Sequence, residues 1–234
     1  MKRFWTEARV EAGADGYGVH LDGKPLRLPA GGPPLCVPAA ALAEAIAAEW
    51  QQAGAATGLM EYADVPLTRL AGTAQLRIAP DPAPSAAAIA AFGESDLLCY
   101  RADTPPTLAA RQAVAWQPWV DWARTDLGAA LTVTTGVMHV RQHPAAIAAL
   151  RRAVDGQGAW VLAGLGIVVP ALGSLVLGLA VAQDALDAMQ AHELSRVDEA
   201  FQAELWGEDP AAAARRVHVE ADIMDAARFM SLVR

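Results

Sequence analysis

Two histidine-containing pairs in this chain have spacings that could support metal chemistry. His139 and His143 stand four residues apart, as two metal ligands on one helix face would. The valines around His139 and the proline after His143 favour extended structure there instead. His192 and Glu193 resemble the start of a zinc-protease helix, but Arg196 occupies the position of the second histidine ligand. The spacings therefore predict no metal site.

The other residues that could carry catalysis lack the motifs that usually accompany them. The sequence contains no Gly-Lys-Ser or Gly-Lys-Thr phosphate loop, and Gly164 and Gly166 lack the third glycine of a dinucleotide loop. Cys36 and Cys99 are far from each other and from a local base, which indicates packed, reduced thiols. We therefore predict no cofactor, no ATP hydrolysis and no catalytic residues.

A row of three side chains suits contact with another surface rather than catalysis. On a helix across Ser195–Asp209, Glu199, Gln202 and Trp206 share one face, at spacings of three and four residues. Carboxylate and amide groups give directional hydrogen bonds, and indole gives a large apolar face. The row either binds a second protein or fixes a neighbouring helix of its own chain. A second stripe is predicted to face the core: Leu194, Val197, Phe201 and Leu205.

The N-terminal part of the chain has the pattern of a small sheet covered by helices. Asp15-Gly16 and Asp22-Gly23 predict tight turns between short antiparallel strands. A helix over residues 38–53 would cover the sheet with an apolar stripe at four-residue spacing. A second helix is predicted after Pro66, with Asp64 capping its first amides.

Beyond residue 79 the periodicity is mainly helical. The stretch at residues 79–85 contains three prolines, so we place a domain boundary there. The prediction is an α+β protein with an N-terminal domain at residues 1–79 and a helical domain at residues 80–234. Interdomain clefts often hold ligands, so an enzyme remains the alternative, with a site assembled from Asp96, Arg101 or His139. The predicted helices are 86–98, 108–124, 144–154, 159–182 as a hairpin, 186–205 and 210–233.

The stretch Ala159–Ala182 carries no charge and is long enough to span a bilayer. Pro170 lies in its middle and lacks a backbone donor, which favours two short buried helices with the second beginning at Pro170. A membrane-associated assembly factor is the alternative.

The net charge of the chain indicates its class of partner, and its first ten residues indicate whether it is secreted. The formal net charge of −8 disfavours nucleic acid and anionic lipid as partners and favours a basic protein. The first ten residues, MKRFWTEARV, reach Glu7 before any apolar run, so they do not predict a secretory signal.

Several stretches match one protein family in the same order along the chain. They are RFW at 3–5, LDGKPLRLPA at 21–30, EW at 49–50, PLTRLAGTA at 66–74, DLLCYRAD at 96–103, Gln112 with Trp116, LGSLVLGLA at 172–180, and DEAFQAELWGED at 198–209. Together they resemble the assembly chaperones for the α subunit of the F-type ATP synthase catalytic head, found in mitochondria and related bacteria. Gln75 departs from the family pattern, in which an acidic residue is more usual.

The resemblance implies a two-domain α+β protein that is not an enzyme. It implies binding of the unassembled α subunit, protection from aggregation and transfer to β, without nucleotide hydrolysis. The location would be the cytoplasm of a bacterium, or the mitochondrial matrix for eukaryotic relatives, and we expect a monomer. The family's partner contact corresponds here to Glu199, Gln202, Trp206, Gly207, Glu208 and Asp209.

Overall fold

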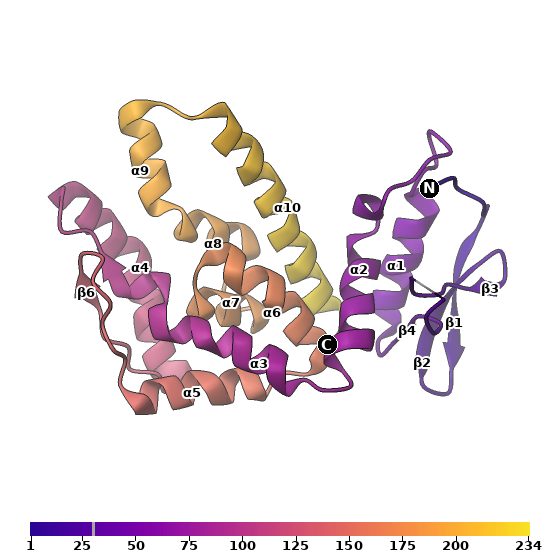
Figure 1. Ribbon diagram of the computed structural model, residues 1–234, viewed down its shortest axis with the longest axis horizontal. Coiled ribbons are helices and arrows are strands. Elements are labelled where there is room, and N and C mark those ends of the chain that lie inside the picture. The colour runs from indigo at the N-terminus through magenta and orange to yellow at the C-terminus, as the bar shows by residue number, and fades with distance from the viewer. Residues whose placement is uncertain (30) are drawn as a thin grey trace. The chain divides into compact units, whose positions relative to one another are not determined.

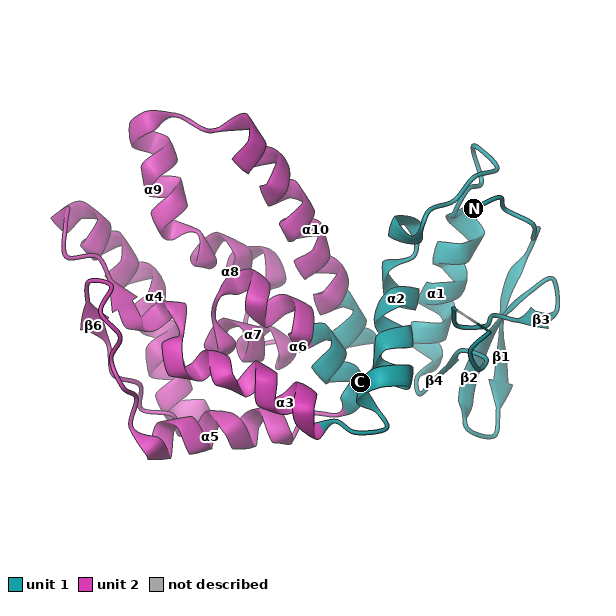
Figure 2. Cartoon of the chain, in the orientation of Figure 1, with its two compact units in different colours: residues 1–82, 159–164, 228–234 teal, residues 83–158, 165–227 magenta. Residues whose placement is uncertain are grey.

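A computed structural model describes residues 1–29 and 31–234, so Ala30, the last residue of the LDGKPLRLPA stretch, lies outside the described residues. The contacts within the chain divide it into two compact units (Figures 1 and 2). Unit 1 contains residues 1–82, 159–164 and 228–234, and unit 2 contains residues 83–158 and 165–227. The domain boundary at residues 79–80 stays a prediction.

Unit 1 contains the predicted antiparallel sheet. Its strands are β1 (Ala8–Gly13), β2 (Gly16–Leu21), β3 (Lys24–Pro25) and β4 (Cys36–Val37). Strand β2 pairs with all three others, and every pairing is antiparallel. Between β2 and β3, Asp22 and Gly23 have φ values of 48° and 76°, as the predicted tight turn requires. The short strand β4 was not predicted.

Helix α1 (Ala40–Gln52) packs against β1 and β2 through the predicted stripe. Leu42, Ile46 and Trp50 on this helix are buried. The Trp5 indole N–H donates to the Trp50 carbonyl oxygen at 2.9 Å, and the two ring centroids lie 4.9 Å apart. An apolar helix face and a paired indole thus close the core of unit 1.

Helix α2 (Pro66–Thr73) begins at the predicted proline, but its cap comes from elsewhere. The Glu49 carboxylate accepts hydrogen bonds from the amides of Leu67 at 2.7 Å and Thr68 at 3.2 Å. Asp64 instead accepts from the Glu61 amide at 2.8 Å, within the 3-10 turn η1 (Tyr62–Asp64). The predicted Asp64 cap is therefore wrong, because a carboxylate from α1 satisfies the α2 amides.

The π-helical turn η2 (Ala74–Ile78) continues α2 and is tied to the chain before β4 by Gln75. The Gln75 amide oxygen accepts from the Cys36 amide at 3.0 Å, and its nitrogen donates to the Pro34 carbonyl oxygen at 3.0 Å. An ionised carboxylate could make only the first of these bonds. Glutamine at this position, where the family more usually has an acidic residue, therefore makes two hydrogen bonds that hold the local structure.

Unit 2 is mainly helical and contains a pair of two-residue parallel strands. The α+β class is confirmed. The elements after η2 are α3 (Ala83–Ala90), the 3-10 turns η3 (Ala91–Ser95) and η4 (Leu97–Cys99), β5 (Tyr100–Arg101), α4 (Pro106–Asp126), β6 (Thr134–Thr135), α5 (Pro144–Asp155), α6 (Ala159–Leu172), α7 (Leu175–Ala182), α8 (Ala188–Ser195), α9 (Val197–Trp206) and α10 (Pro210–Leu232); α6 and α10 contribute residues to both units.

The apolar stretch forms two helices, but the break lies after Pro170. Helix α6 runs through Pro170 and ends before Gly173, which has a φ of 63°. Ser174 then caps α7 by accepting the Leu177 amide at 3.1 Å. The predicted break at Pro170 is wrong because the left-handed turn needs a residue without Cβ, and Gly173 provides it. Among the described residues, no helix has both the length and the apolar character to cross a membrane.

The first amides of α7 are also held by a buried carboxylate, Asp96. Its Oδ1 accepts from the Ser174 hydroxyl at 2.8 Å and from the Leu98 amide at 3.1 Å. Its Oδ2 accepts from the Val176 amide at 3.0 Å. Burial raises the pKa of Asp96 above its ordinary value, although these donors favour the charged form and oppose that rise. Asp96 therefore has a structural role at the start of an entirely buried helix.

Candidate functional site

A hollow of about 520 Å³ lies in unit 2 where α8, α9 and α10 meet. Helices α9 and α10 are joined by the short segment at residues 207–209 and lie next to each other in Figure 1. The side chains around the hollow come from α6, from α8 and α9 with the residue between them, from the 207–209 segment and from α10. This arrangement makes an open concave surface from segments that are separate in sequence.

Helix α9 is a separate helix from α8, which differs from the continuous helix that was predicted. The break is at Arg196, whose φ and ψ are −117° and 18°. In the predicted core stripe Phe201 is buried, but Leu205 is 59% exposed. The prediction for Leu205 is wrong because α9 packs on α4 through Phe201 and Glu204, while the Leu205 side chain points to solvent.

Contacts with α4 hold the other face of α9. The Arg111 guanidinium pairs with both oxygens of Glu204, each at 2.7 Å, and lies 5.2 Å from the Phe201 ring centroid. The Gln112 amide nitrogen donates to Asp198 Oδ1 at 2.6 Å. Glu204 and Phe201 lie on the helix face away from the row of Glu199, Gln202 and Trp206, and Asp198 lies at the edge between the two faces. Helix α9 is therefore fixed without using that row.

The structure brings all the sequence-predicted contact residues together around the hollow. Three of them, Glu199, Gln202 and Trp206, are exposed on α9, and the Trp206 side chain is 78% exposed. Among the described residues, neither the Gln202 amide nor the Trp206 indole N–H has a hydrogen-bond partner. The full set around the hollow is Glu199, Gln202, Trp206, Gly207, Glu208 and Asp209.

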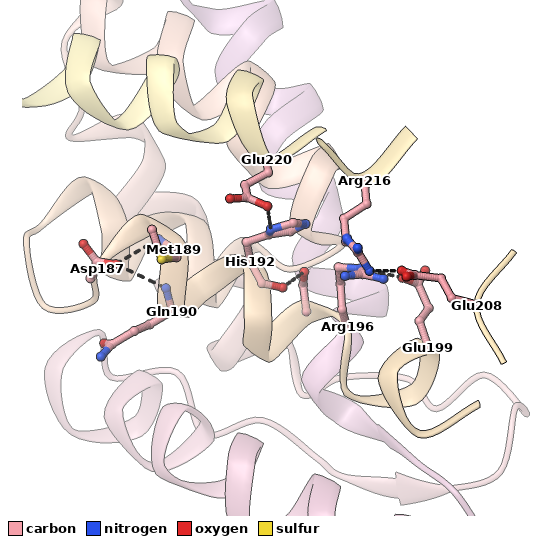
Figure 3. Close-up of polar contacts among 10 residues, drawn as sticks. Asp187, Met189, Gln190, His192, Arg196, Glu199, Glu208, Arg216 and Glu220 are labelled. Atoms are coloured by element: carbon pink, nitrogen blue, oxygen red, sulfur yellow. Dashed lines mark hydrogen bonds and ion pairs between the residues drawn. The ribbon is translucent and has the colours of Figure 1, made fainter. Parts of the chain in front are cut away.

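Two ion pairs face this hollow, and each joins an acidic residue to an arginine that sequence reasoning missed. Arg196 Nε lies 2.7 Å from Glu199 Oε2, and the Arg216 guanidinium pairs with Glu208 (Figure 3). Arg215 also lines the hollow, and no carboxylate in the described part of the chain forms an ion pair with it. The surface is therefore of mixed charge.

The segment between α9 and α10 has the geometry that the sequence predicted. Gly207 follows α9 with a φ of 85°, and its amide donates to the Ala203 carbonyl oxygen at 2.9 Å. The Asp209 carboxylate accepts from the amides of Ala211 and Ala212, both at 3.2 Å. Gly207 thus ends one helix and Asp209 caps the next, which fixes the position of Glu208 between them.

His192 on α8 lies at the base of the hollow and is only 5% exposed. Its Nδ1 lies 3.7 Å from Glu220 Oε2 on α10, and its buried Nε2 has no hydrogen-bond partner among the described residues (Figure 3). Burial, followed by the positive charge of Arg196, lowers the pKa of His192 below its ordinary value. A neutral imidazole therefore supports the hollow at physiological pH.

The histidine pair considered for metal binding has other partners. His139 Nδ1 lies 3.1 Å from the Tyr100 hydroxyl oxygen, and His143 Nδ1 accepts from the Ala145 amide at 3.2 Å. Within residues 1–29 and 31–234, no group of three or more His, Cys, Asp or Glu side chains could hold a metal ion.

The residues of the alternative enzyme site do not line the hollow. Asp96 is enclosed at the start of α7, and Arg101 donates to the Gln112 carbonyl oxygen at 2.5 Å while lying 5.1 Å from the Trp116 ring centroid. Burial raises the pKa of the nearby Cys99 to about 12, so its thiol is a poor nucleophile. The hollow combines an amide, an indole and ion pairs, which suits contact with a protein surface.

Comparisons with known proteins agree with this description. Residues 2–124 match the ATP12 chaperone protein family. The crystal structure of Atp12 from Paracoccus denitrificans is 42% identical, with a TM-score of 0.94, over 100% of this chain and 98% of that one. A mutant of the Paracoccus protein gives the same values. The Atu1473 protein from Agrobacterium tumefaciens is 36% identical, with a TM-score of 0.92, over 100% of this chain and 86% of that one. The chain therefore belongs to the ATP12 chaperone family.

Proposed function

We propose that this chaperone of ATP synthase assembly binds the unassembled α subunit of the catalytic head. It prevents aggregation of that subunit and transfers it to β without hydrolysing ATP. Family membership supports the chaperone role in assembly. The identity of the client rests on the resemblance of the DEAFQAELWGED stretch at residues 198–209 to the family's partner-contact motif.

One observation carries the proposal: the motif residues surround a single hollow and their hydrogen-bonding groups are available. Gln202 and Trp206 are exposed and have no hydrogen-bond partner in the described part of the chain, while the other face of α9 is packed on α4. An indole with a polar surround is a common arrangement at the centre of protein interfaces. The hollow can therefore accept a convex part of a client.

The ion pairs of the hollow also suit release of the bound client. Before a client binds, Glu199 and Glu208 already pair with arginines of the same chain. A client group that displaces one of these arginines gains little net energy, because one exposed ion pair replaces another. A β subunit that buries a larger and more apolar area can then displace the chaperone. We place this exchange in the cytoplasm of a bacterial cell and propose that the chaperone acts as a monomer.

The test is co-expression with the α subunit, followed by size-exclusion chromatography and light scattering of α diluted from denaturant. The expected result is co-elution, suppressed aggregation of α, and release of α when β is added, all without nucleotide. A chain that neither co-elutes with α nor suppresses its aggregation would contradict the proposal. A parallel run with an unrelated aggregation-prone protein separates specific capture from general holding of unfolded chains.

A further inference from the structure

A second hollow, within unit 1, has a different chemistry from the first. It has a volume of about 290 Å³ and lies beside α1, α2 and the chain that follows β3. Leu28, Trp50 and Met60 contribute to its lining and are themselves buried, so the deepest part is apolar. Tyr62 and Leu76 also line it and are 61% and 43% exposed, so the apolar surface continues to the outside. We call this feature the unit 1 groove.

The walls of the unit 1 groove are held by specific bonds. The Trp50 indole N–H donates to the Thr68 hydroxyl at 2.9 Å, and the Glu49 carboxylate accepts the Thr68 amide at 3.2 Å. These bonds join α1 to the start of α2 beneath the groove. Gly72 on α2 leaves room at the groove wall, since a Cβ there would lie 3.1 Å from Leu28 Cδ2. Hydrogen bonds and close packing therefore fix the walls of the groove, and it is not a gap between loosely packed side chains.

Three exposed arginines surround this apolar surface. Arg27, Arg69 and Arg77 line the unit 1 groove, and in the described part of the chain none of them has a carboxylate within ion-pair distance. Elsewhere in the chain, Arg111 and Arg196 by contrast pair with glutamates. The Arg27 guanidinium donates to the Gly32 carbonyl oxygen at 3.3 Å, which neutralises no charge. In a chain of net charge −8, three guanidinium groups without a paired carboxylate in the described part of the chain make the edge of this groove locally basic.

We propose that the unit 1 groove binds an acidic polypeptide segment that carries a bulky apolar side chain. The apolar side chain would lie against Trp50 and Met60, and carboxylates on either side of it would pair with Arg69 and Arg77. Guanidinium groups bind carboxylates through two parallel hydrogen bonds, which a neutral or basic segment cannot accept. Three guanidinium groups around one groove match a segment with several Asp or Glu residues better than they match a single anion. This surface is separate from the hollow of unit 2 and goes beyond the proposed binding of α.

A direct test uses a synthetic probe, the hexapeptide Asp-Glu-Leu-Phe-Asp-Glu with both ends blocked, titrated into the full chain by isothermal calorimetry. We expect saturable one-to-one binding that weakens as salt is raised, because exposed charge pairs are screened. The double variant Arg69→Glu with Arg77→Glu should weaken binding by about tenfold or more, which corresponds to about 1.4 kcal/mol. Lys24→Glu reverses one charge outside the groove, since this exposed residue of β3 does not line it, and this control should leave binding unchanged.

Three results would overturn the proposal. The first is the absence of saturable binding up to about 1 mM peptide, the limit of even weak specific association. The second is equal binding of Lys-Lys-Leu-Phe-Lys-Lys, which would mean that only the apolar surface is recognised. The third is a dimer of the chain that the double variant dissociates, which would make a second copy the occupant. Near-ultraviolet circular dichroism reports the packing of the aromatic side chains, the Trp5 and Trp50 pair among them, and checks that each variant is folded. The experiment contains no α subunit, so its failure leaves the α-subunit proposal standing.

Discussion

Arg111 and Glu204 form a two-point ion pair, with both nitrogen–oxygen distances at 2.7 Å, that joins α4 to α9. The pair lies on the face of α9 turned away from the hollow. A helix that is held on one face can present its other face without being rearranged by a partner. Substitutions on the two faces of α9 should therefore have separable effects, on binding at one face and on stability at the other.

Reversing the charge of Glu199 should reduce capture of α without unfolding the chain. The Glu199 side chain is 66% exposed and pairs only with Arg196 in the described structure, so its loss should change the free energy of unfolding by less than about 1 kcal/mol. Glu199→Lys also places a like charge beside Arg196 and Arg216 in the hollow. Co-elution with α measures capture, and urea unfolding measures stability.

The matched control for this change is Glu193→Lys. Glu193 is an exposed residue of α8 that does not line the hollow, so the same change in net charge should leave co-elution intact. Equal loss of capture in both variants would indicate a general effect of charge and would refute a contact at Glu199.

Shortening two aromatic residues of α9 should separate binding from stability. Trp206→Ala removes a side chain that is 78% exposed, so we expect a change in unfolding free energy within about 0.5 kcal/mol and a clear loss of capture. Phe201→Ala removes a buried ring and should cost about 3 kcal/mol. Urea unfolding and co-elution with α give both quantities; a strongly destabilised Trp206→Ala variant would mean that the indole is part of the core.

Gln112 connects three segments, so replacing it with leucine should loosen α9. The Gln112 side chain accepts the Ala102 amide at 2.6 Å and donates to Asp198 at 2.6 Å. Leucine would leave the Ala102 amide unsatisfied, at a cost of about 1–3 kcal/mol. Hydrogen exchange should become faster in α9 than in α7. The exposed Gln117 lies on the same helix, and Gln117→Leu should leave exchange in α9 unchanged.

His192 should make the chain less stable at acid pH. Its folded-state pKa is lowered from 6.5, so below that pH the unfolded chain binds this proton more readily than the folded one. Stability should therefore rise as pH increases toward 6.5, and His192→Gln should flatten this dependence. Urea unfolding at pH values from about 5 to about 8, on both sides of the ordinary histidine pKa, measures this dependence of the free energy of unfolding. An unchanged slope in the variant would show that other groups control the dependence.

Asp96 should produce a dependence of the opposite sign. Its folded-state pKa is raised from 3.8, so its contribution is fully present below that pH and is lost as pH rises through the folded-state value. The stability of the natural chain relative to Asp96→Asn should therefore fall as pH rises, because asparagine does not ionise. If the difference grew with pH instead, the hydrogen bonds at the start of α7 would outweigh the effect of burial.

Local patterns predicted those features whose causes are local. The Asp22-Gly23 turn depends on two adjacent residues, and the burial of Leu42, Ile46 and Trp50 depends on spacing within one helix. The same is true of the row on α9, because three side chains on one short helix share a face wherever that helix lies. Gly207 and Asp209 act on neighbouring backbone groups, so their roles could also be predicted.

Features that join distant segments could not be predicted in this way. The cap of α2 comes from Glu49 on α1, and Arg215 enters the hollow from α10. Leu205 has the spacing of a core residue, yet in the described part of the chain its side chain is largely exposed. In each case the deciding contact depends on the tertiary arrangement. Hydrophobic spacing along one helix carries no information about that arrangement.

The stacked rings of Trp160 and Phe229, whose centroids lie 6.2 Å apart, have a consequence for biosynthesis. Both residues belong to unit 1, together with residues 1–82. Residues 1–82 leave the ribosome long before Phe229 is added, so unit 1 is complete only after nearly the whole chain has been made. Translation at about 5–20 residues per second makes this delay several seconds or more. During that interval the incomplete unit 1 of this chaperone would itself be a substrate for general chaperones.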